Sequence, residues 1–174
     1  MIRMATVLIA ATLAMSGVAR AEPTARIIAE HESQPGESKE AFLQRYAVFL
    51  DGWTGQNGVE ACGVIAEKDG AYSVITQTMD SQVECSSNAI YSGWASTGET
   101  IHSHPPADPD GWLRLNAKTI EVSGDLLGGR TQVAVLPKTF SPGDIAAGPG
   151  YLVCSGELLY QSGDGTAKAV ASIR

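Results

Sequence analysis

The chain has 174 residues, of which 12 are basic and 19 are acidic, and its formal net charge is −7. Such a surface repels phosphate backbones, and no cluster of lysines and arginines offsets the repulsion, which excludes nucleic acid as an expected partner. The length suits a single domain that can enclose a hydrophobic core without depending on disulfides.

The N-terminus has the pattern of a cleaved secretory signal. A short basic start is followed by an uninterrupted apolar and small run over residues 5–18, and Ala19-Arg20-Ala21 has the small-x-small form of a signal-peptidase site. The run is shorter than the about 20 residues of a membrane span, and polar sequence follows it. We therefore predict a signal peptide at residues 1–21 and a periplasmic or secreted mature chain without stable membrane insertion. The alternative is an uncleaved N-terminal anchor.

Cleavage would remove two of the 12 basic residues and none of the 19 acidic ones, leaving 10 against 19 and a charge of −9.

Residues 22–37 are polar and contain prolines and a glycine, so we predict a lead-in segment in which His31 is solvated. Ser38 can cap a helix that continues to about Asp51. The apolar residues of this helix share one face: Phe42, Leu43, Tyr46, Phe49 and Leu50.

Strands account for most of the remaining chain. We predict a hairpin of strands 61–67 and 71–78, followed by a strand over 91–104. Residues 106–130 are rich in Pro, Asp and Gly and form a long excursion. A strand at 132–136, a short helix at 141–147 and strands at 151–154, 158–161 and 168–173 complete the chain. The sequence therefore predicts a single α+β domain over residues 38–174, built on one strongly bent mixed sheet flanked by helices.

The three cysteines, Cys62, Cys85 and Cys154, make an odd count for an exported chain. One disulfide and one buried thiol is the simplest interpretation, because exported proteins meet an oxidising environment. The sequence leaves all three pairings open. A thiolate metal site is disfavoured, because no two cysteines have short ligand spacing.

Two of the three histidines stand one residue apart in Thr100-Ile101-His102-Ser103-His104-Pro105. Side chains at i and i+2 of a strand point to the same face, so His102 and His104 can reach one metal ion. Neutral imidazole is a preferred ligand of zinc. An isolated His-x-His pair is nevertheless more often a surface or loop feature than a metal site.

Two further segments carry the residues that a zinc hydrolase needs. Glu60 opens the apolar strand Ala61-Cys62-Gly63-Val64-Ile65, and Ser141-Pro142-Gly143-Asp144 places a serine and an aspartate three apart at a helix start. Together with His-x-His-Pro, these segments resemble the JAMM (MPN-domain) zinc metallopeptidase family. That family has a Glu before a Cys-Gly-hydrophobic strand, then His-x-His-Pro, then Ser-x-x-Asp. The resemblance spans residues 38–161.

The resemblance implies an MPN-type fold whose layering is similar to that of cytidine deaminases. It also implies a Zn²⁺ ion held by His102, His104 and Asp144. Glu60 would act as the general base for water, and Ser141 would stabilise the oxyanion while a peptide or isopeptide bond is hydrolysed. Cytoplasmic members of the family remove ubiquitin-like modifiers. For an exported protein, peptidoglycan peptides or secreted polypeptides are the hypotheses.

The spacing departs from the family pattern after the histidines. The family places its Ser-x-x-Asp soon after the His-x-His, whereas His104 and Asp144 are 40 positions apart. An insertion at about 106–136 could loop out, since loop length costs only slowly in entropy. We favour Asp144 as the third ligand, because a helix and then a strand follow there as in the family. Asp108 or Asp110 is the alternative.

Each segment also has an ordinary interpretation. Glu60 alone fits a solvated residue at a strand edge, and residues 141–144 alone fit a common helix start. From the combination we expect an exported zinc-dependent peptidase or amidase. The alternatives are a catalytically silent MPN-type domain, a disulfide-stabilised secreted binding module with incidental histidines, and a thiol hydrolase that uses Cys62.

Overall fold

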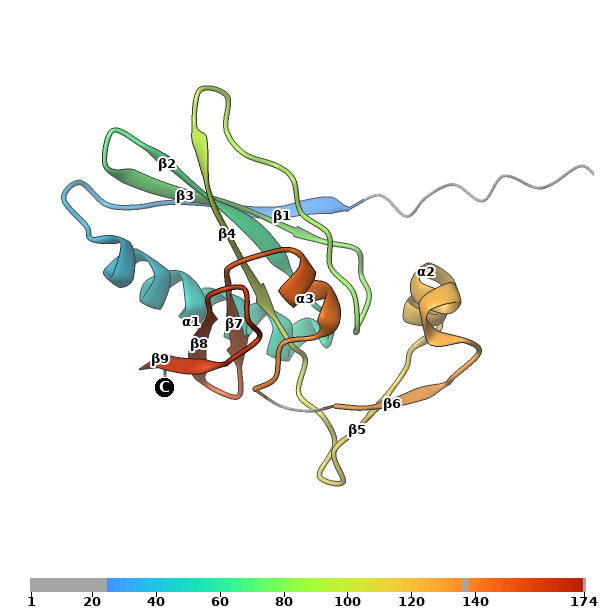
Figure 1. Ribbon diagram of the computed structural model, residues 1–174. Coiled ribbons are helices and arrows are strands. Elements are labelled where there is room, and N and C mark those ends of the chain that lie inside the picture. Colours follow the sequence, from blue (N-terminus) through green and yellow to red (C-terminus); the bar gives the residue numbers. More distant parts are fainter. Residues whose placement is uncertain (1–24, 136–137, 174) are drawn as a thin grey trace, which may run out of the picture.

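The computed structural model describes residues 25–135 and 138–173 (Figure 1). Within them, seven strands form a mixed sheet in the order β1-β3-β2-β4-β7-β8-β9, two short strands form a second sheet, and three helices complete the domain. The predicted α+β class is confirmed. The predicted signal peptide at 1–21 lies outside the described residues. No helix of the described ranges is long and apolar enough to cross a membrane.

The large sheet consists of β1 (Arg26–Glu32), β2 (Cys62–Lys68), β3 (Ala71–Thr78), β4 (Ala95–Ser103), β7 (Gly150–Cys154), β8 (Glu157–Gln161) and β9 (Lys168–Ser172). The helices are α1 (Lys39–Asn57), α2 (Ala117–Leu127) and α3 (Pro142–Ala146), and the small sheet pairs β5 (Trp112–Arg114) with β6 (Gln132–Ala134). The predicted hairpin of β2 and β3 is present and turns at Asp69 and Gly70, which both have positive φ. Strands β4 and β7 run parallel, so the connection between them has to cross over, and it carries α2, α3 and the small sheet.

Strand β1 lies inside the segment that the sequence predicted to be a polar lead-in. It pairs with β3 at the edge of the sheet, where charged side chains such as Arg26, Glu30 and Glu32 are common. The prediction that His31 is solvated is also wrong. Its ring packs against Tyr46 and Phe49 of α1, with centroids 5.1 and 4.3 Å away. Burial, and then the charge of Arg45, lower the pKa of His31.

Helix α1 begins where the sequence predicted and ends later. The Ser38 hydroxyl accepts a hydrogen bond from the Ala41 N–H at 3.2 Å, which makes Ser38 the N-cap. The helix continues through the turn-forming residues after Asp51 and ends at Gly58, whose φ of 66° is the left-handed conformation of a helix C-cap. Tertiary packing overrides local preference here, since Thr54 lies buried in this extra turn.

One face of the sheet packs against α1 and forms the main core. The buried apolar residues of this cluster are Phe42, Leu43, Tyr46, Ala47, Leu50, Ala61, Ile65, Val74, Ile101, Val153 and Leu158. A smaller cluster of Phe140, Leu152, Cys154 and Leu159 lies apart from it, with Ile145 of α3 packed against it. Burial of each large side chain stabilises the fold by roughly 1.5–3 kcal/mol, so the α1 side carries most of the stability.

The excursion after the histidines contains a strand and a helix that the sequence did not predict, because its periodicity is weak. Asn116 caps α2 by accepting from the Thr119 N–H at 2.7 Å, and β6 ends at Ala134. Hydrogen bonds attach this insertion to the segment that follows β3. The Gln82 N–H donates to Thr119 Oγ1 at 3.0 Å, and the Ser81 and Ser123 hydroxyls lie 2.8 Å apart.

Candidate metal centre

His102 and His104 lie at the end of β4, in the middle of the large sheet. His102 is paired with Cys62 of β2 in the antiparallel ladder. Ser103, between the histidines, points to the α1 side, where its hydroxyl contacts the Thr54 hydroxyl. The imidazoles therefore lie on the other face, with ring centroids 5.0 Å apart. The predicted placement of the pair on one face follows from this alternation.

Asp144 reaches the histidines from the first turn of α3. The Ser141 hydroxyl accepts from the Asp144 N–H at 3.2 Å, and Asp144 Oδ2 accepts from the Ser141 N–H at 2.7 Å. This capping box fixes the carboxylate at the start of the helix. The same Oδ2 lies 3.5 Å from His102 Nε2. The insertion therefore does bring Asp144 back to the histidines.

His102, His104 and Asp144 form a group that could hold a metal ion, because their ligand atoms all lie within 4.8 Å of one another. Ligand atoms around tetrahedral zinc are about 3.4 Å apart, close to the 3.5 Å between His102 Nε2 and Asp144 Oδ2. His102 Nε2 is buried and has no hydrogen-bond partner among the residues that the structure describes. Buried polar atoms normally have partners. We conclude that these residues fit a metal ion.

The protonation states of the group also favour metal binding. Burial, and then the neighbouring His102, lower the pKa of His104 to about 4. Burial alone would raise the pKa of Asp144, but its interactions with His102 and Ser141 bring the pKa below its ordinary value. At neutral pH, His104 is therefore neutral and Asp144 ionised, which are the forms that bind metals.

Glu60 lies beside the histidines, just before β2. Its N–H donates to the Ser81 carbonyl at 2.8 Å, and its carbonyl accepts from the Thr78 hydroxyl at 2.7 Å. The side-chain Oε1 is 3.8 Å from His104 Nε2, too far for a direct hydrogen bond. The residue is only 8 % exposed. The ordinary interpretation of Glu60 as a solvated residue is therefore wrong.

Burial raises the pKa of Glu60 well above its ordinary value, and the charges of Asp144 and Glu84 raise it further. A carboxyl with a raised pKa holds a proton more readily than an ordinary carboxyl does. The structure therefore places a group suited to general base chemistry next to the candidate ligands.

The remaining predicted site residues lie as follows. Ser141 is exposed, and because its oxygen accepts the N-cap hydrogen bond, its own O–H can donate elsewhere. Asp108 lies outside the metal group of the described residues. It accepts from the backbone N–H groups of Asp110 and Trp112 at 3.2 and 2.8 Å, and so closes a turn of the insertion. Asp110 is likewise outside the metal group and exposed.

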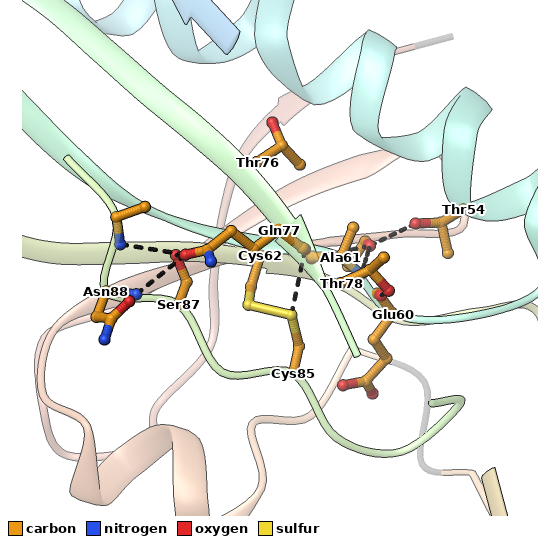
Figure 2. The surroundings of a disulfide bond; sticks show 12 residues. Thr54, Glu60, Ala61, Cys62, Thr76, Gln77, Thr78, Cys85, Ser87 and Asn88 are labelled. Atoms are coloured by element: carbon orange, nitrogen blue, oxygen red, sulfur yellow. Dashed lines mark hydrogen bonds between the residues drawn. A yellow bond between two sulfur atoms is a disulfide. The ribbon is translucent and has the colours of Figure 1, made fainter. Parts of the chain in front are cut away.

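A disulfide joins Cys62 to Cys85, and Cys154 is a buried free thiol. The predicted combination of one disulfide and one buried thiol is confirmed, and the bond indicates an oxidising environment. Figure 2 shows the disulfide and the Glu60 side chain extending to the same side of the sheet. Because its sulfur is in this bond, Cys62 is not a free nucleophile, which removes the thiol-hydrolase alternative.

Two adjoining cavities meet at the candidate metal centre and form one cleft. The first, of about 620 Å³, is bordered by Glu84, Cys85, Ser86, Ser87 and Thr100, and we name it the acidic arm. The second, of about 540 Å³, is bordered mainly by apolar side chains, and we name it the apolar arm: Pro105, Leu113, Leu127, Val133, Val135 and Phe140. Arg130 and Gln82 also border the apolar arm. Both arms share Glu60, Val83, His104, Leu126, Ser141 and Pro142. Volumes of this size suit peptide-sized ligands.

The sequence did not identify Val83, Glu84 or Leu126 as site residues. None of them belongs to a motif, and they reach the cleft only because the disulfide and the insertion place them there. The long insertion itself was the feature of the sequence that could have pointed to them, since binding residues concentrate on loops held by a rigid scaffold.

Comparisons with protein families, with curated proteins and with solved structures found no match to this chain.

Proposed function

We propose that this protein is an exported zinc-dependent hydrolase of peptide or isopeptide bonds, similar in its site to the JAMM metallopeptidases. One observation carries the proposal. Three metal-binding side chains from β4 and α3 converge, and a buried glutamate stands 3.8 Å from one of them. A binding module with incidental histidines gives no reason for this convergence across a 40-position gap.

The ion that best suits the group is zinc. Two imidazoles and one carboxylate match the ligand sets of catalytic zinc, which leave a position for water or substrate. Zinc held there supplies Lewis acidity and lowers the pKa of a water molecule towards about 7. His102, His104 and Asp144 would hold the ion, and the Ser141 capping box would keep Asp144 in place.

Glu60 would accept a proton from the attacking water and return it to the leaving amine. Its burial keeps the carboxyl out of bulk water, and its raised pKa in the metal-free protein makes it a ready proton acceptor. The charge of a bound cation would lower that pKa and so favour the carboxylate form that takes the proton.

Ser141 would donate a hydrogen bond to the oxygen of the substrate carbonyl as negative charge develops on it. The hydroxyl borders both arms of the cleft, and its proton is not used in the N-cap hydrogen bond. Donors fixed before the reaction stabilise such an oxyanion at little reorganisation cost.

The predicted signal and the disulfide support a periplasmic or secreted location. Substrates there would be polypeptides of that compartment or the stem peptides and cross-links of peptidoglycan. The acidic chain and its acidic cleft give no support to a nucleic-acid partner.

Hydrolysis by the zinc-loaded mature chain tests the proposal. We expect a mass-spectrometric peptide library, which includes ε-amino-linked peptides, to show cleavage by the wild type. Glu60→Gln should keep the metal and lower kcat by roughly 10²–10⁴-fold. Cleavage by Glu60→Gln at the wild-type rate would refute the mechanism. Binding of peptides without any cleavage would favour a catalytically silent domain.

A further inference from the structure

We propose that the cleft selects amide substrates that carry a cationic group on one side of the scissile bond and an apolar side chain on the other. The acidic arm would hold the cation through Glu84, and the apolar arm would hold the apolar side chain beside Leu126. This selection rests on the proposed function, because it concerns the same site.

Glu84 is the charged residue that distinguishes the acidic arm. Its side chain is partly buried, and no other side chain of the described ranges forms an ion pair or hydrogen bond with it. Among residues 25–135 and 138–173, no lysine or arginine borders this arm. A ligand that covers this carboxylate removes its water, which is costly unless the ligand brings a cation. An ammonium or guanidinium group of a ligand would supply the missing partner through charge-assisted hydrogen bonds.

The segment that carries Glu84 is held firmly before any ligand arrives. Cys85, the next residue, is bonded to Cys62 of β2. Gln77 of β3 holds the other end, since its side-chain oxygen accepts from the Ser87 hydroxyl at 3.1 Å and from the Asn88 N–H at 3.2 Å (Figure 2). A carboxylate on such a fixed segment loses little conformational entropy when it binds.

The apolar arm is built mainly by the insertion. Leu113 and Leu127 are buried in it, 7 % and 4 % exposed, together with Phe140 from the segment before α3. Leu126 borders the cleft and is 69 % exposed, unusual for a leucine next to buried neighbours. An apolar substrate side chain would cover this exposed surface, and removal of apolar surface from water favours binding.

The arms therefore differ in the chemistry that they offer on the two sides of one centre. The described part of the chain places no lysine or arginine along the acidic arm, and the chain has a net charge of −7. Acidic substrates would meet repulsion in that arm. Glycine-rich substrates would leave the apolar arm without contacts. Basic and apolar residues flanking one amide bond satisfy both arms.

The test uses quenched fluorescent peptides and the zinc-loaded mature chain. One side of the scissile bond carries Lys, Gln or Glu, and the other side carries Leu or Gly. Each pair is synthesised in both orientations along the peptide. We expect kcat/KM for the Lys–Leu pair to exceed that for Glu–Leu by roughly tenfold to a hundredfold in one of the two orders. Glu84→Lys should reverse this preference. Glu32→Gln, which removes an exposed carboxylate far along β1, is the matched control.

Leu126→Ser should lower the preference for Leu over Gly several-fold, because it removes the exposed leucine from the apolar arm. Val48→Ser is the matched control, since Val48 is 54 % exposed on α1 and borders neither arm. Equal loss in both variants would contradict the role of Leu126.

Peptide binding distinguishes the proposed substrate selection from the proposed hydrolase activity. Zinc-loaded Glu60→Gln is titrated with the same peptides, and their anisotropy is measured. Charge-selective binding that Glu84→Lys reverses, without cleavage by the wild type, would support the cleft and refute the hydrolase. Cleavage of Lys and Glu peptides at equal rates, unchanged by Glu84→Lys, would refute the selection and leave the hydrolase standing.

Discussion

The two faces of the seven-stranded sheet are built from the same strands and differ in almost every physical property. On the α1 side of the sheet, eleven buried apolar residues of the helix and the sheet form one cluster. The cluster on the opposite side has four, and beside it lie a buried glutamate, two histidines and a cleft. Strand β4 shows the division at successive residues, since Ile101 is buried in the α1 core while His102 faces the cleft.

This division explains how one domain can contain a polar site and still be stable. Alternation along a strand lets each residue serve one face without disturbing the other. The α1 face supplies the burial that stabilises the fold, so the cleft face can keep unpaired polar atoms such as His102 Nε2. Substitutions on the two faces should therefore have different effects on stability and on metal binding.

The largest effect on stability is expected on the α1 face. Ile101→Ala should lower the free energy of unfolding by about 2–5 kcal/mol, because it leaves a cavity in the main core. His102→Ala should change that of the metal-free protein by less than about 1 kcal/mol, because the lost imidazole had a nitrogen without a partner. Urea unfolding in a chelator measures both. A loss from His102→Ala as large as that from Ile101→Ala would show that both faces stabilise the fold equally.

The disulfide should have the next largest effect, and on both faces. It closes a loop between residues 23 positions apart, and its removal in Cys62→Ser/Cys85→Ser should cost about 3 kcal/mol of unfolding free energy. It should also weaken charge selection, because the Glu84 segment loses its bond to β2. Cys154→Ala is the control for loss of a cysteine. Unchanged selectivity in the double variant would show that Gln77 alone positions the segment.

A smaller effect is expected at the start of α3. Ser141→Ala removes the N-cap, which costs about 1 kcal/mol and releases one end of the capping box. Zinc affinity should fall roughly fivefold, as Asp144 becomes less fixed. Ser141→Thr keeps a capping hydroxyl and should restore the affinity. Competition with a fluorescent chelator measures it, and equal affinities for the alanine and threonine variants would exclude a positioning role for the cap.

The smallest effect on stability is expected at the exposed ion pair beside the edge strand β1. Arg26 bonds to Asp80 at 2.6 Å at an exposed position, so Arg26→Ala should cost less than about 1 kcal/mol. The Arg26 guanidinium lowers the pKa of Asp80. The pair therefore stabilises the fold at neutral pH, and this contribution is lost as the pH falls through the folded-state pKa of Asp80. Urea unfolding at neutral and acid pH should show the difference shrinking in acid.

The parts of the fold that could be predicted are those in which local pattern and tertiary packing agree. Strand alternation placed His102 and His104 together, and Ser38 marked the start of α1. The end of α1 could not be predicted, because packing of Thr54 overrides turn-forming residues. Strand β1 was missed because its charged residues, which are common on edge strands, make the segment look polar.

The candidate site also has a part that the sequence could predict and a part that it could not. Its ligands His102, His104 and Asp144, and Glu60 beside them, could be proposed because they stand in short segments of recognisable order. Glu84 and Leu126 could not, because their positions depend on a disulfide pairing and on the docking of the insertion through Gln82. Long-range contacts of this kind leave no local pattern in the sequence.

Metal content of the purified mature chain is the most direct test of the candidate centre. The wild type, His102→Ala, Asp144→Ala and the matched control Asp108→Ala are dialysed against zinc, freed of excess metal and measured by plasma mass spectrometry. We expect about one zinc per chain in the wild type and in Asp108→Ala, and little in the other two variants. Zinc retained in Asp144→Ala and lost in Asp108→Ala would contradict the centre described here.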